Sequence, residues 1–352
     1  MKENLLRPRC HLLGGALVLL LGFGASRLPA KIGLTLVIFN VAFVAVWLTA
    51  DALRNWGVWT IRTPYKLDTP ILVETKISDH HWLTIVTQGH ERYGTVATPN
   101  TVGHERVDGD YDVKYTIGSD SWRTIPDARP EVAFLGCSFT FGTGVQDEEC
   151  FAAVLNNQYW TDHKVRNYAL MGYGTRQACL ILEDRLKREP RPAAVFYGWL
   201  YDHIRRNYLG KEYHGHMGQG ARFPFFELVG DSVEFRGLRK ATDATMPTGA
   251  PETFEKEVKV TIALLRKMDQ MCREQKIPFF FVMLGQKYPL ADDPVAKFVA
   301  SSEIQSLDLR DIKQGFFVND PHPNRDWHAA TAAAIAKDPR MAFLKAKAAK
   351  DD

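Results

Sequence analysis

The chain has 352 residues, of which 45% are hydrophobic and 24% are charged, and these proportions exclude a wholly disordered or collagenous chain. Its length suits one large α/β domain with an attachment, because single cores stop growing near roughly 250–300 residues. A net charge of +3, from 44 basic and 41 acidic side chains, gives no reason to expect a nucleic-acid partner. The five cysteines contain no CxxC pair, which argues against a zinc knuckle and a disulfide scaffold.

Two apolar stretches, residues 11–26 and 32–50, open the chain and are separated by a short basic link. The second approaches the roughly 20 residues that cross a bilayer, and it carries Trp47 near one end, where an interfacial aromatic is favoured. We therefore expect a membrane anchor and linker over residues 1–68, with one or two transmembrane helices. Cations flank both stretches, so the positive-inside rule does not fix the orientation. We expect the cell (inner) membrane, with the rest of the chain extracytoplasmic if only the second stretch spans.

A small β-rich segment is predicted between the anchor and the main domain, over residues 69–128. Apolar side chains alternate with polar ones from Tyr111 to Ile117, which is the period of a half-buried strand. Asp108-Gly109 and Gly118 supply turns on either side. This segment is called the lead-in below.

From Glu131 onward, apolar runs alternate with helical stretches, a pattern typical of parallel βαβ units. Strands are predicted at residues 132–135, 165–169, 194–198, 279–284 and 304–309. Helices are predicted at residues 148–159, 176–187, 253–275 and 325–337. Residues 129–345 are therefore expected to form an α/β domain with a parallel sheet of about five strands. An insertion at about 208–251 is expected to carry a hairpin near Gly230-Asp231.

The sequence from Phe134 to Gly142, FLGCSFTFG, leads from a buried strand through small residues into a helix start. In a doubly wound sheet this is the carboxyl edge, where side chains meet ligands. Ser138 could act there as a nucleophile activated by an imidazole, while backbone N–H groups stabilise an oxyanion. It could equally cap the helix that follows, which is a common task for serine. The motif alone leaves both interpretations open.

Two further stretches have residues suited to serine-dependent acyl transfer. Residues 167–175, NYALMGYGT, place glycines at a strand-to-helix turn, where the main chain can approach a substrate closely. Residues 320–324, DPHPN, place Asp320 and His322 in a Pro-bounded loop after the last strand. An imidazole titrates near neutrality, and a carboxylate fixes its tautomer. His328 falls within the following helix, where packing or capping is the expected role.

With these blocks the chain resembles the SGNH (GDSL-like) hydrolase superfamily, particularly membrane-anchored bacterial members whose first block reads Gly-x-Ser-Phe-Thr-Phe-Gly. The resemblance covers residues 111–335. It implies a flavodoxin-like three-layer sandwich in which Ser138, His322 and Asp320 form a catalytic triad. It also implies that the backbone N–H groups of Ser138 and Gly172 belong to the oxyanion hole, and that neither a cofactor nor a metal is needed.

Two positions depart from the family pattern. Cys137 stands where an aspartate is common, and strand alternation is expected to point it away from Ser138. Residues 195–207 correspond to the third block of the family, and Tyr201 stands where that block has an asparagine that donates to the oxyanion. His203, Tyr201 or Asn207 could replace that donor, and we expect His203 to belong to the oxyanion hole. An alternative role for His203 is a structural pair with the adjacent Asp202.

The expected function is that of a serine-dependent ester hydrolase or O-acyltransferase. The substrate implied by the resemblance is a small-molecule or glycan ester, and an O-acylated glycan is the best expectation. One alternative is a non-catalytic SGNH-fold protein that binds glycans or assists polysaccharide assembly. Another is a cysteine enzyme that uses Cys137, which requires that side chain to face the pocket. His214-Gly215-His216 is interpreted as a surface loop rather than a metal site.

Overall fold

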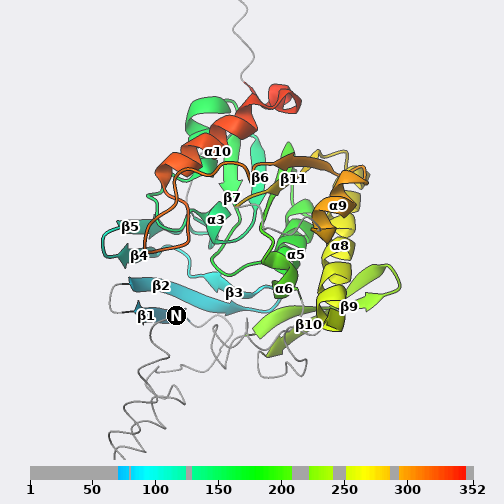
Figure 1. Ribbon diagram of the computed structural model, residues 1–352, viewed down its shortest axis with the longest axis horizontal. Coiled ribbons are helices and arrows are strands. Elements are labelled where there is room, and N and C mark those ends of the chain that lie inside the picture. The colour runs from blue at the N-terminus through cyan, green and yellow to red at the C-terminus, as the bar shows by residue number, and fades with distance from the viewer. Residues whose placement is uncertain are drawn as a thin grey trace, which may run out of the picture. The chain divides into compact units, whose positions relative to one another are not determined.

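The computed structural model describes residues 70–78, 81–123, 129–207, 222–240, 251–285 and 293–345 (Figure 1). The predicted membrane anchor, residues 1–68, lies outside these ranges, and so does the 214–216 motif. Within the described ranges, no helix combines the length and the apolar character needed to cross a bilayer.

The lead-in is an antiparallel sheet, as the alternating pattern predicts. Strands β2 (His81–His90), β4 (Val102–Val107) and β5 (Tyr111–Thr116) follow one another across the sheet, with β1 (Pro70–Ser78) at the free side of β2. The short β3 (Gly94–Ala97) also pairs with β2. Every second residue of β4 is buried, and in β5 Val113 and Tyr115 are buried between exposed neighbours, so one face of this part of the sheet is covered and the other is exposed.

The main domain is built on a five-stranded parallel sheet, which confirms the predicted architecture. Its strands are β6 (Glu131–Leu135), β7 (Lys164–Asn167), β8 (Ala194–Trp199), β11 (Phe279–Met283) and β12 (Gln305–Asp308). Their order is β12-β11-β8-β6-β7, which is the flavodoxin-like order with the first strand of the domain inside the sheet. All residues of β6, β8 and β11 are buried, because helices cover both faces.

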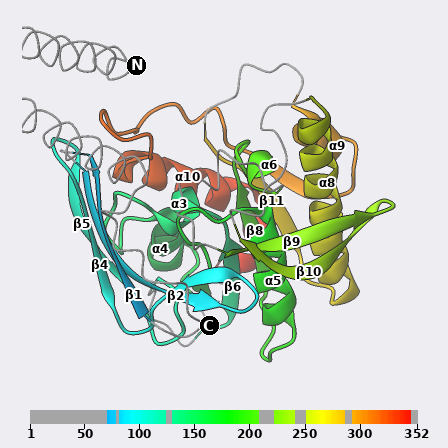
Figure 2. The same cartoon turned by 90° about the horizontal axis from the view of Figure 1, so that it is seen from below.

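Helices on the two faces complete three layers (Figure 2). One face is covered by α5 (Thr175–Leu186) and α8 (Pro251–Glu274). The other is covered by α4 (Phe151–Val154), its π-helical continuation Leu155–Tyr159, and α10 (Arg325–Lys337). Apolar side chains from alternate strand positions form a separate core with each helical layer. The other short helices are α6 (His203–Arg206), α9 (Pro294–Ala300) and a 3₁₀ helix (Pro339–Leu344).

The predicted insertion contains the expected hairpin, formed by β9 (Arg222–Val229) and β10 (Ser232–Lys240). This hairpin packs on α8. One predicted helix is shorter than expected, because residues 148–150 do not belong to it. Asp147 is bound to Arg123, and Glu149 accepts the backbone N–H of Gln146, so this stretch is held as a loop.

Candidate active site

Ser138 lies at the carboxyl edge of the parallel sheet, next to its topological switch point. The chain runs from β6 to β7 on one side and later returns to β8 on the other side of β6. In open α/β sheets, ligands bind outside the carboxyl ends of the strands at such a point. Ser138 is the first residue of the one-turn helix α3 (Ser138–Phe141), three residues after β6 ends.

The Ser138 side chain does not cap α3, which was the alternative interpretation of this residue. The N-cap position is Cys137, and no side-chain hydrogen bond caps the helix. The Ser138 carbonyl instead accepts the backbone N–H groups of Gly142 at 2.9 Å and Thr143 at 3.0 Å, which closes the turn. The first N–H groups of a helix have no partner within the helix, so they point out of the end at which Ser138 lies.

Two glycines create the space into which α3 packs. A Cβ atom on Gly136 would lie 2.1 Å from Thr140 Oγ1, and one on Gly198 would lie 2.2 Å from the same atom. Thr140 is fully buried between these two strand ends. The glycine before Cys137-Ser138 therefore serves the packing of the helix that begins at Ser138, and Gly198 on β8 serves it from the neighbouring strand.

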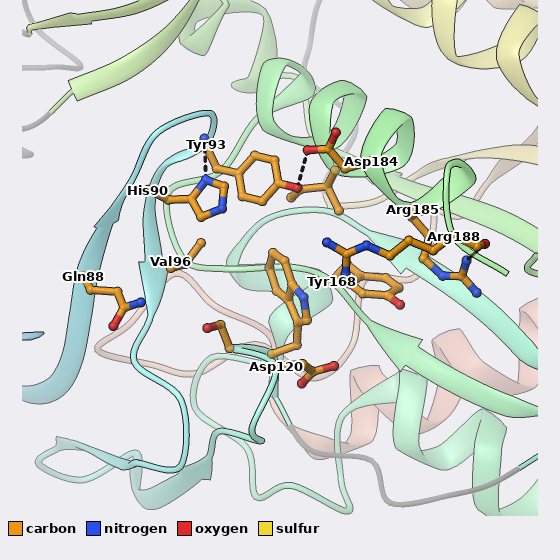
Figure 3. A pocket seen from close by; sticks show the side chains of 12 residues that line it. Gln88, His90, Tyr93, Val96, Asp120, Tyr168, Asp184, Arg185 and Arg188 are labelled. Atoms are coloured by element: carbon orange, nitrogen blue, oxygen red, sulfur yellow. Dashed lines mark hydrogen bonds between the residues drawn. The ribbon is translucent and has the colours of Figure 1, made fainter. Parts of the chain in front are cut away.

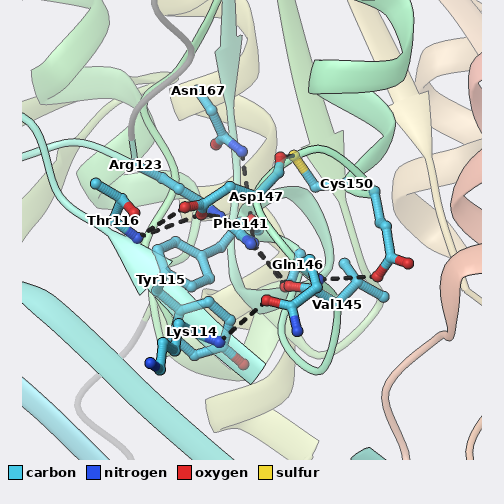
Figure 4. A network of polar contacts seen from close by, with 12 residues as sticks. Lys114, Tyr115, Thr116, Arg123, Phe141, Val145, Gln146, Asp147, Cys150 and Asn167 are labelled. Atoms are coloured by element: carbon cyan, nitrogen blue, oxygen red, sulfur yellow. Dashed lines mark hydrogen bonds and ion pairs between the residues drawn. The ribbon is translucent and has the colours of Figure 1, made fainter. Parts of the chain in front are cut away.

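A buried polar network holds the C-terminal end of α3 in place (Figure 4). The Arg123 guanidinium donates to the carbonyls of Phe141 at 2.6 Å and Gly142 at 2.7 Å, and it pairs with Asp147 at 2.7 Å. Asn167, the last residue of β7, donates to the Thr140 carbonyl at 2.7 Å. Charge-assisted bonds to the last carbonyls of a helix satisfy groups that the helix leaves unpaired.

Asp320 and His322 form a hydrogen-bonded pair, as the sequence motif predicts. The ring Nδ1 of His322 lies 2.6 Å from Asp320 Oδ1, and the same oxygen accepts the His322 backbone N–H at 2.9 Å. Burial of Asp320 acts to raise the pKa of its carboxyl, but the hydrogen bonds and charge of His322 outweigh it and lower that pKa. The ionised carboxylate accepts this hydrogen bond, so Nδ1 of His322 is the donor.

The loop of this pair is closed on itself and lies against the residue that follows Ser138. The Phe317 backbone N–H donates to the His322 carbonyl at 3.1 Å, and Phe316 bridges to Pro323. The ring centroids of His322 and Phe139 are 5.7 Å apart. The fold therefore brings the imidazole and the α3 turn together from positions far apart in the sequence.

His328 has a structural role, as expected from its place in a helix. Its ring is fully buried and stacks on Phe151, with centroids 5.8 Å apart. Its Nδ1 accepts the Phe151 backbone N–H at 3.2 Å, so it caps the start of α4. Burial and the nearby charges of Arg123 and His322 lower the pKa of His328 to about 3. This imidazole is neutral at physiological pH and has no access to the sheet edge.

Gly172 lies in the loop after β7 and adopts a positive φ of 78°. This is the left-handed region, where a side chain would be strained, so the position favours glycine. The loop is partly exposed at Met171 and Gly172. A backbone N–H presented from this loop stays the prediction for the second oxyanion donor.

The third block places its polar side chains in the interior. His203 is fully buried, and its Nδ1 lies 2.7 Å from the Tyr197 hydroxyl. Burial and the charge of Arg206 hold the pKa of His203 well below its usual range. Asn207 Nδ2 donates to Thr175 and Thr261. Asp202 is exposed, so the structural partner of His203 is Tyr197, and His203 is left out of the oxyanion hole proposed below.

Cys137 does not offer a nucleophile. Its side chain is fully buried in the core between the sheet and the α4–α10 layer. This agrees with the expected direction away from Ser138, and it contradicts the alternative of a cysteine enzyme, which requires an accessible thiol.

A separate pocket of about 140 Å³ lies between the β2–β3 strands and α5 (Figure 3). Its walls include Tyr93, Tyr168 and Arg185, and it contains none of the predicted site residues. The Tyr93 hydroxyl donates to Asp184, and Arg185 pairs with a buried carboxylate of β6, Glu131. Several of its polar groups are therefore already paired, and we assign it no role.

Sequence reasoning missed the residues that hold α3, Arg123 and Asn167. Asn167 opens the stretch of residues 167–175, but its side-chain role has no local signal. Arg123 follows the lead-in strands, and only the three-dimensional structure shows that it reaches the carbonyls beyond Ser138.

No protein-family model matches the chain, and no curated protein matches it. Among solved structures, it is similar to a lipolytic protein of the G-D-S-L family from Desulfitobacterium hafniense (13% identity, TM-score 0.37, covering 59% of this chain and 98% of the other). It is also similar to an arylesterase from Agrobacterium tumefaciens (17%, 0.38, 59% and 96%) and an acetyl xylan esterase from Butyrivibrio proteoclasticus (12%, 0.37, 66% and 66%). By name, these three solved structures are a lipolytic protein of the G-D-S-L family and two esterases.

Proposed function

We propose that the protein is a serine-dependent ester hydrolase or O-acyltransferase with Ser138 as nucleophile, His322 as base and Asp320 as orienting carboxylate. The observation that carries this proposal is the Asp320–His322 hydrogen bond of 2.6 Å, on a loop whose imidazole lies against Phe139, next to Ser138. An acid–base pair beside a hydroxyl at a sheet edge is the arrangement that acyl transfer requires.

In the proposed reaction, Ser138 Oγ attacks the ester carbonyl while His322 Nε2 takes the hydroxyl proton. The backbone N–H groups of Ser138 and Gly172 would stabilise the oxyanion that forms. The intermediate collapses as the carbon–oxygen bond to the alcohol breaks, and His322 returns the proton to the departing alkoxide. An acyl-Ser138 ester remains. Water or a sugar hydroxyl then attacks the acyl carbon, and His322 takes the proton of that attacking group. His322 returns the proton to Ser138 Oγ as the bond between Oγ and the acyl carbon breaks, so Ser138 is regenerated and the acid or the new ester leaves.

The proposed substrate is an O-acylated glycan or a small-molecule ester, and the proposed setting is the extracytoplasmic face of the cell membrane. The substrate proposal draws support from an acetyl xylan esterase among the similar structures. The setting draws on the apolar sequence of residues 32–50. Hydrolysis of an acyl-ester panel with and without added sugar acceptor would separate hydrolase from transferase.

The direct test is covalent labelling by a fluorophosphonate probe, which reports an activated serine. Labelling should be lost in Ser138→Ala and His322→Ala to a similar extent, because triad members act as a unit. His328→Asn is the matched histidine control and should keep most of the labelling rate. Loss of labelling in folded His328→Asn with retention in His322→Ala would move the base to His328. Absence of labelling in the wild type would favour a non-catalytic glycan-binding protein.

A further inference from the structure

The loop of Asp320 and His322 is held from outside the parallel sheet, by the turn between β4 and β5 of the lead-in. The Asp110 carboxylate accepts the backbone N–H of Val318 at 3.1 Å and that of Asn319 at 2.7 Å, on separate oxygens. The Asn319 side chain donates to the carbonyl of Asp108 at 3.2 Å. These bonds join segments that lie 208 to 211 residues apart in the chain.

These polar contacts restrain a loop tip that is otherwise open to solvent. Val318 is 91% exposed, so apolar packing does not hold it. One residue earlier, the ring of Phe317 packs on Tyr111, with centroids 4.7 Å apart. Asp110 therefore binds the two residues between Phe317, which is packed, and Asp320, the predicted orienting carboxylate.

The same sheet contacts the segment that follows α3. The Tyr115 hydroxyl accepts the Gly144 backbone N–H at 2.8 Å and donates to the buried Glu105 at 2.5 Å. A Cβ on Gly144 would come within 2.5 Å of Phe317 and 3.0 Å of Tyr111, so the three segments meet here without spare room. The lead-in thus contacts both segments that carry the proposed triad.

His81 adds an electrostatic link between the lead-in and the triad. Its ring lies 2.7 Å from Glu105, and this hydrogen bond outweighs burial and raises the pKa of His81. The His81 charge also contributes to lowering the pKa of Asp320, after the larger effects of His322. The inner face of the lead-in therefore lies close enough to Asp320 to affect its ionisation.

We propose that the β4–β5 hairpin contributes to catalysis by holding the Asp320–His322 loop in place, and that Asp110 is the positioning residue for this loop. This inference rests on the proposed function. Its physical basis is that a base displaced by about 1 Å from its nucleophile can lose on the order of 10²-fold in rate. Asp110 acts through His322 and does not touch the substrate.

The test is Asp110→Asn, an isosteric change that replaces one acceptor oxygen by a donor facing a backbone N–H. We expect kcat for p-nitrophenyl acetate and the rate of fluorophosphonate labelling to fall roughly 10- to 100-fold, with KM changed little. The final extent of labelling and the melting temperature should stay at wild-type values. Asp112→Asn is the matched control, because Asp112 is an exposed carboxylate of the same hairpin that bonds to His104.

Two further measurements separate positioning from general destabilisation. Hydrogen exchange should accelerate in residues 316–322 of Asp110→Asn and stay unchanged elsewhere in the parallel-sheet domain. Adding Asp110→Asn to His322→Ala should cause no further loss of residual esterase rate, since a group that acts through His322 has nothing left to position. Asn319→Ala removes the side-chain hydrogen bonds to the Asp108 carbonyl and to Asp110 Oδ1 but keeps the two backbone ones. It should show the same effects more weakly, and it serves if Asp110→Asn does not fold.

The inference would be overturned if hydrogen exchange in residues 316–322 of Asp110→Asn is faster while its labelling rate equals that of the wild type. The proposed function would not be affected by that result. Equal losses from Asp110→Asn in the wild-type and His322→Ala backgrounds would also overturn the inference. A wild-type protein that the probe does not label would remove the proposed function, and the positioning role would fall with it.

Discussion

Replacing Asp320 by asparagine tests the proposed triad with the smallest change in shape. Asp320 is 7% exposed, and its Oδ1 accepts both the ring and the backbone N–H of His322. An amide in this place can present a donor to Nδ1, which favours the tautomer with the proton on Nε2. His322 could then no longer accept the proton of Ser138. The same replacement in a serine triad lowers kcat by about 10⁴, or about 5 kcal/mol of transition-state stabilisation.

The assay is the pH dependence of kcat for p-nitrophenyl acetate, measured alongside thermal unfolding. Asp326→Asn is the control, because Asp326 is an exposed carboxylate close to His322 in sequence. The lowered pKa of Asp320 means that its ionised form stabilises the fold above the unfolded-state pKa, and this contribution is lost as pH falls through the folded-state pKa. Asp320→Asn should therefore lower the melting temperature at pH 7 more than at pH 3. A variant that keeps more than about a tenth of the wild-type kcat would remove Asp320 as the orienting group.

Three further predictions concern buried groups. Burial raises the pKa of Glu257 to about 7, although the charges of Arg205 and Arg176 act to lower it. The carboxyl therefore ionises less readily in the folded chain than in the unfolded chain, and the folded protein loses stability as pH rises from about 4.5 to 7. Glu257→Gln should raise the melting temperature at pH 8 but not at pH 4, and the exposed Glu255→Gln should not. Because the pKa of His328 is lowered in the folded chain, its imidazole becomes protonated in the unfolded chain at a higher pH than in the folded chain. The stability of the wild-type protein therefore falls as pH drops from about 6.5 towards 3. His328→Phe should cost roughly 1–3 kcal/mol in urea unfolding at pH 8, through the unpaired Phe151 N–H, and a smaller amount at pH 5. Gly198→Ala should destabilise the protein through its 2.2 Å contact with Thr140 Oγ1, and Thr140→Ala in the same chain should recover part of that loss; additive unfolding free energies would contradict the contact.

Elements with local signals were predicted with bounds close to those observed. Helix α10 has the predicted bounds, residues 325–337, because Asn324 caps its start by accepting the N–H groups of Asp326 and Trp327. The apolar runs of β6, β8 and β11 identify strands buried on both faces. Strand order has no comparable local signal, since it depends on which edge each crossover returns to. The flavodoxin-like order was therefore expected only from the family resemblance.

The site residues also fall into those that have a local sequence signal and those that have none. Asp320 and His322 are two residues apart, so their hydrogen bond is a local feature that the DPHPN motif predicts. The directions of the third-block side chains have no local signal, because residue type alone does not say whether a polar side chain points to the sheet edge or to the interior. His203 and Asn207 both turn inward, where Tyr197 and Thr175 supply partners.

The sequence of the lead-in also predicts an inward-facing carboxylate, if strand alternation is applied to every residue of β4. In β4 the inward positions are Gly103, Glu105 and Val107, so the two-residue period places a carboxylate on the covered face. A buried carboxylate without partners is costly, so its presence demands hydrogen-bond donors close to it. His81 and Tyr115 are those donors. The Tyr115 hydroxyl also accepts the Gly144 backbone N–H beyond α3, so the hydrogen bonds of this inward-facing acid lead to the contact between the lead-in and the parallel-sheet domain.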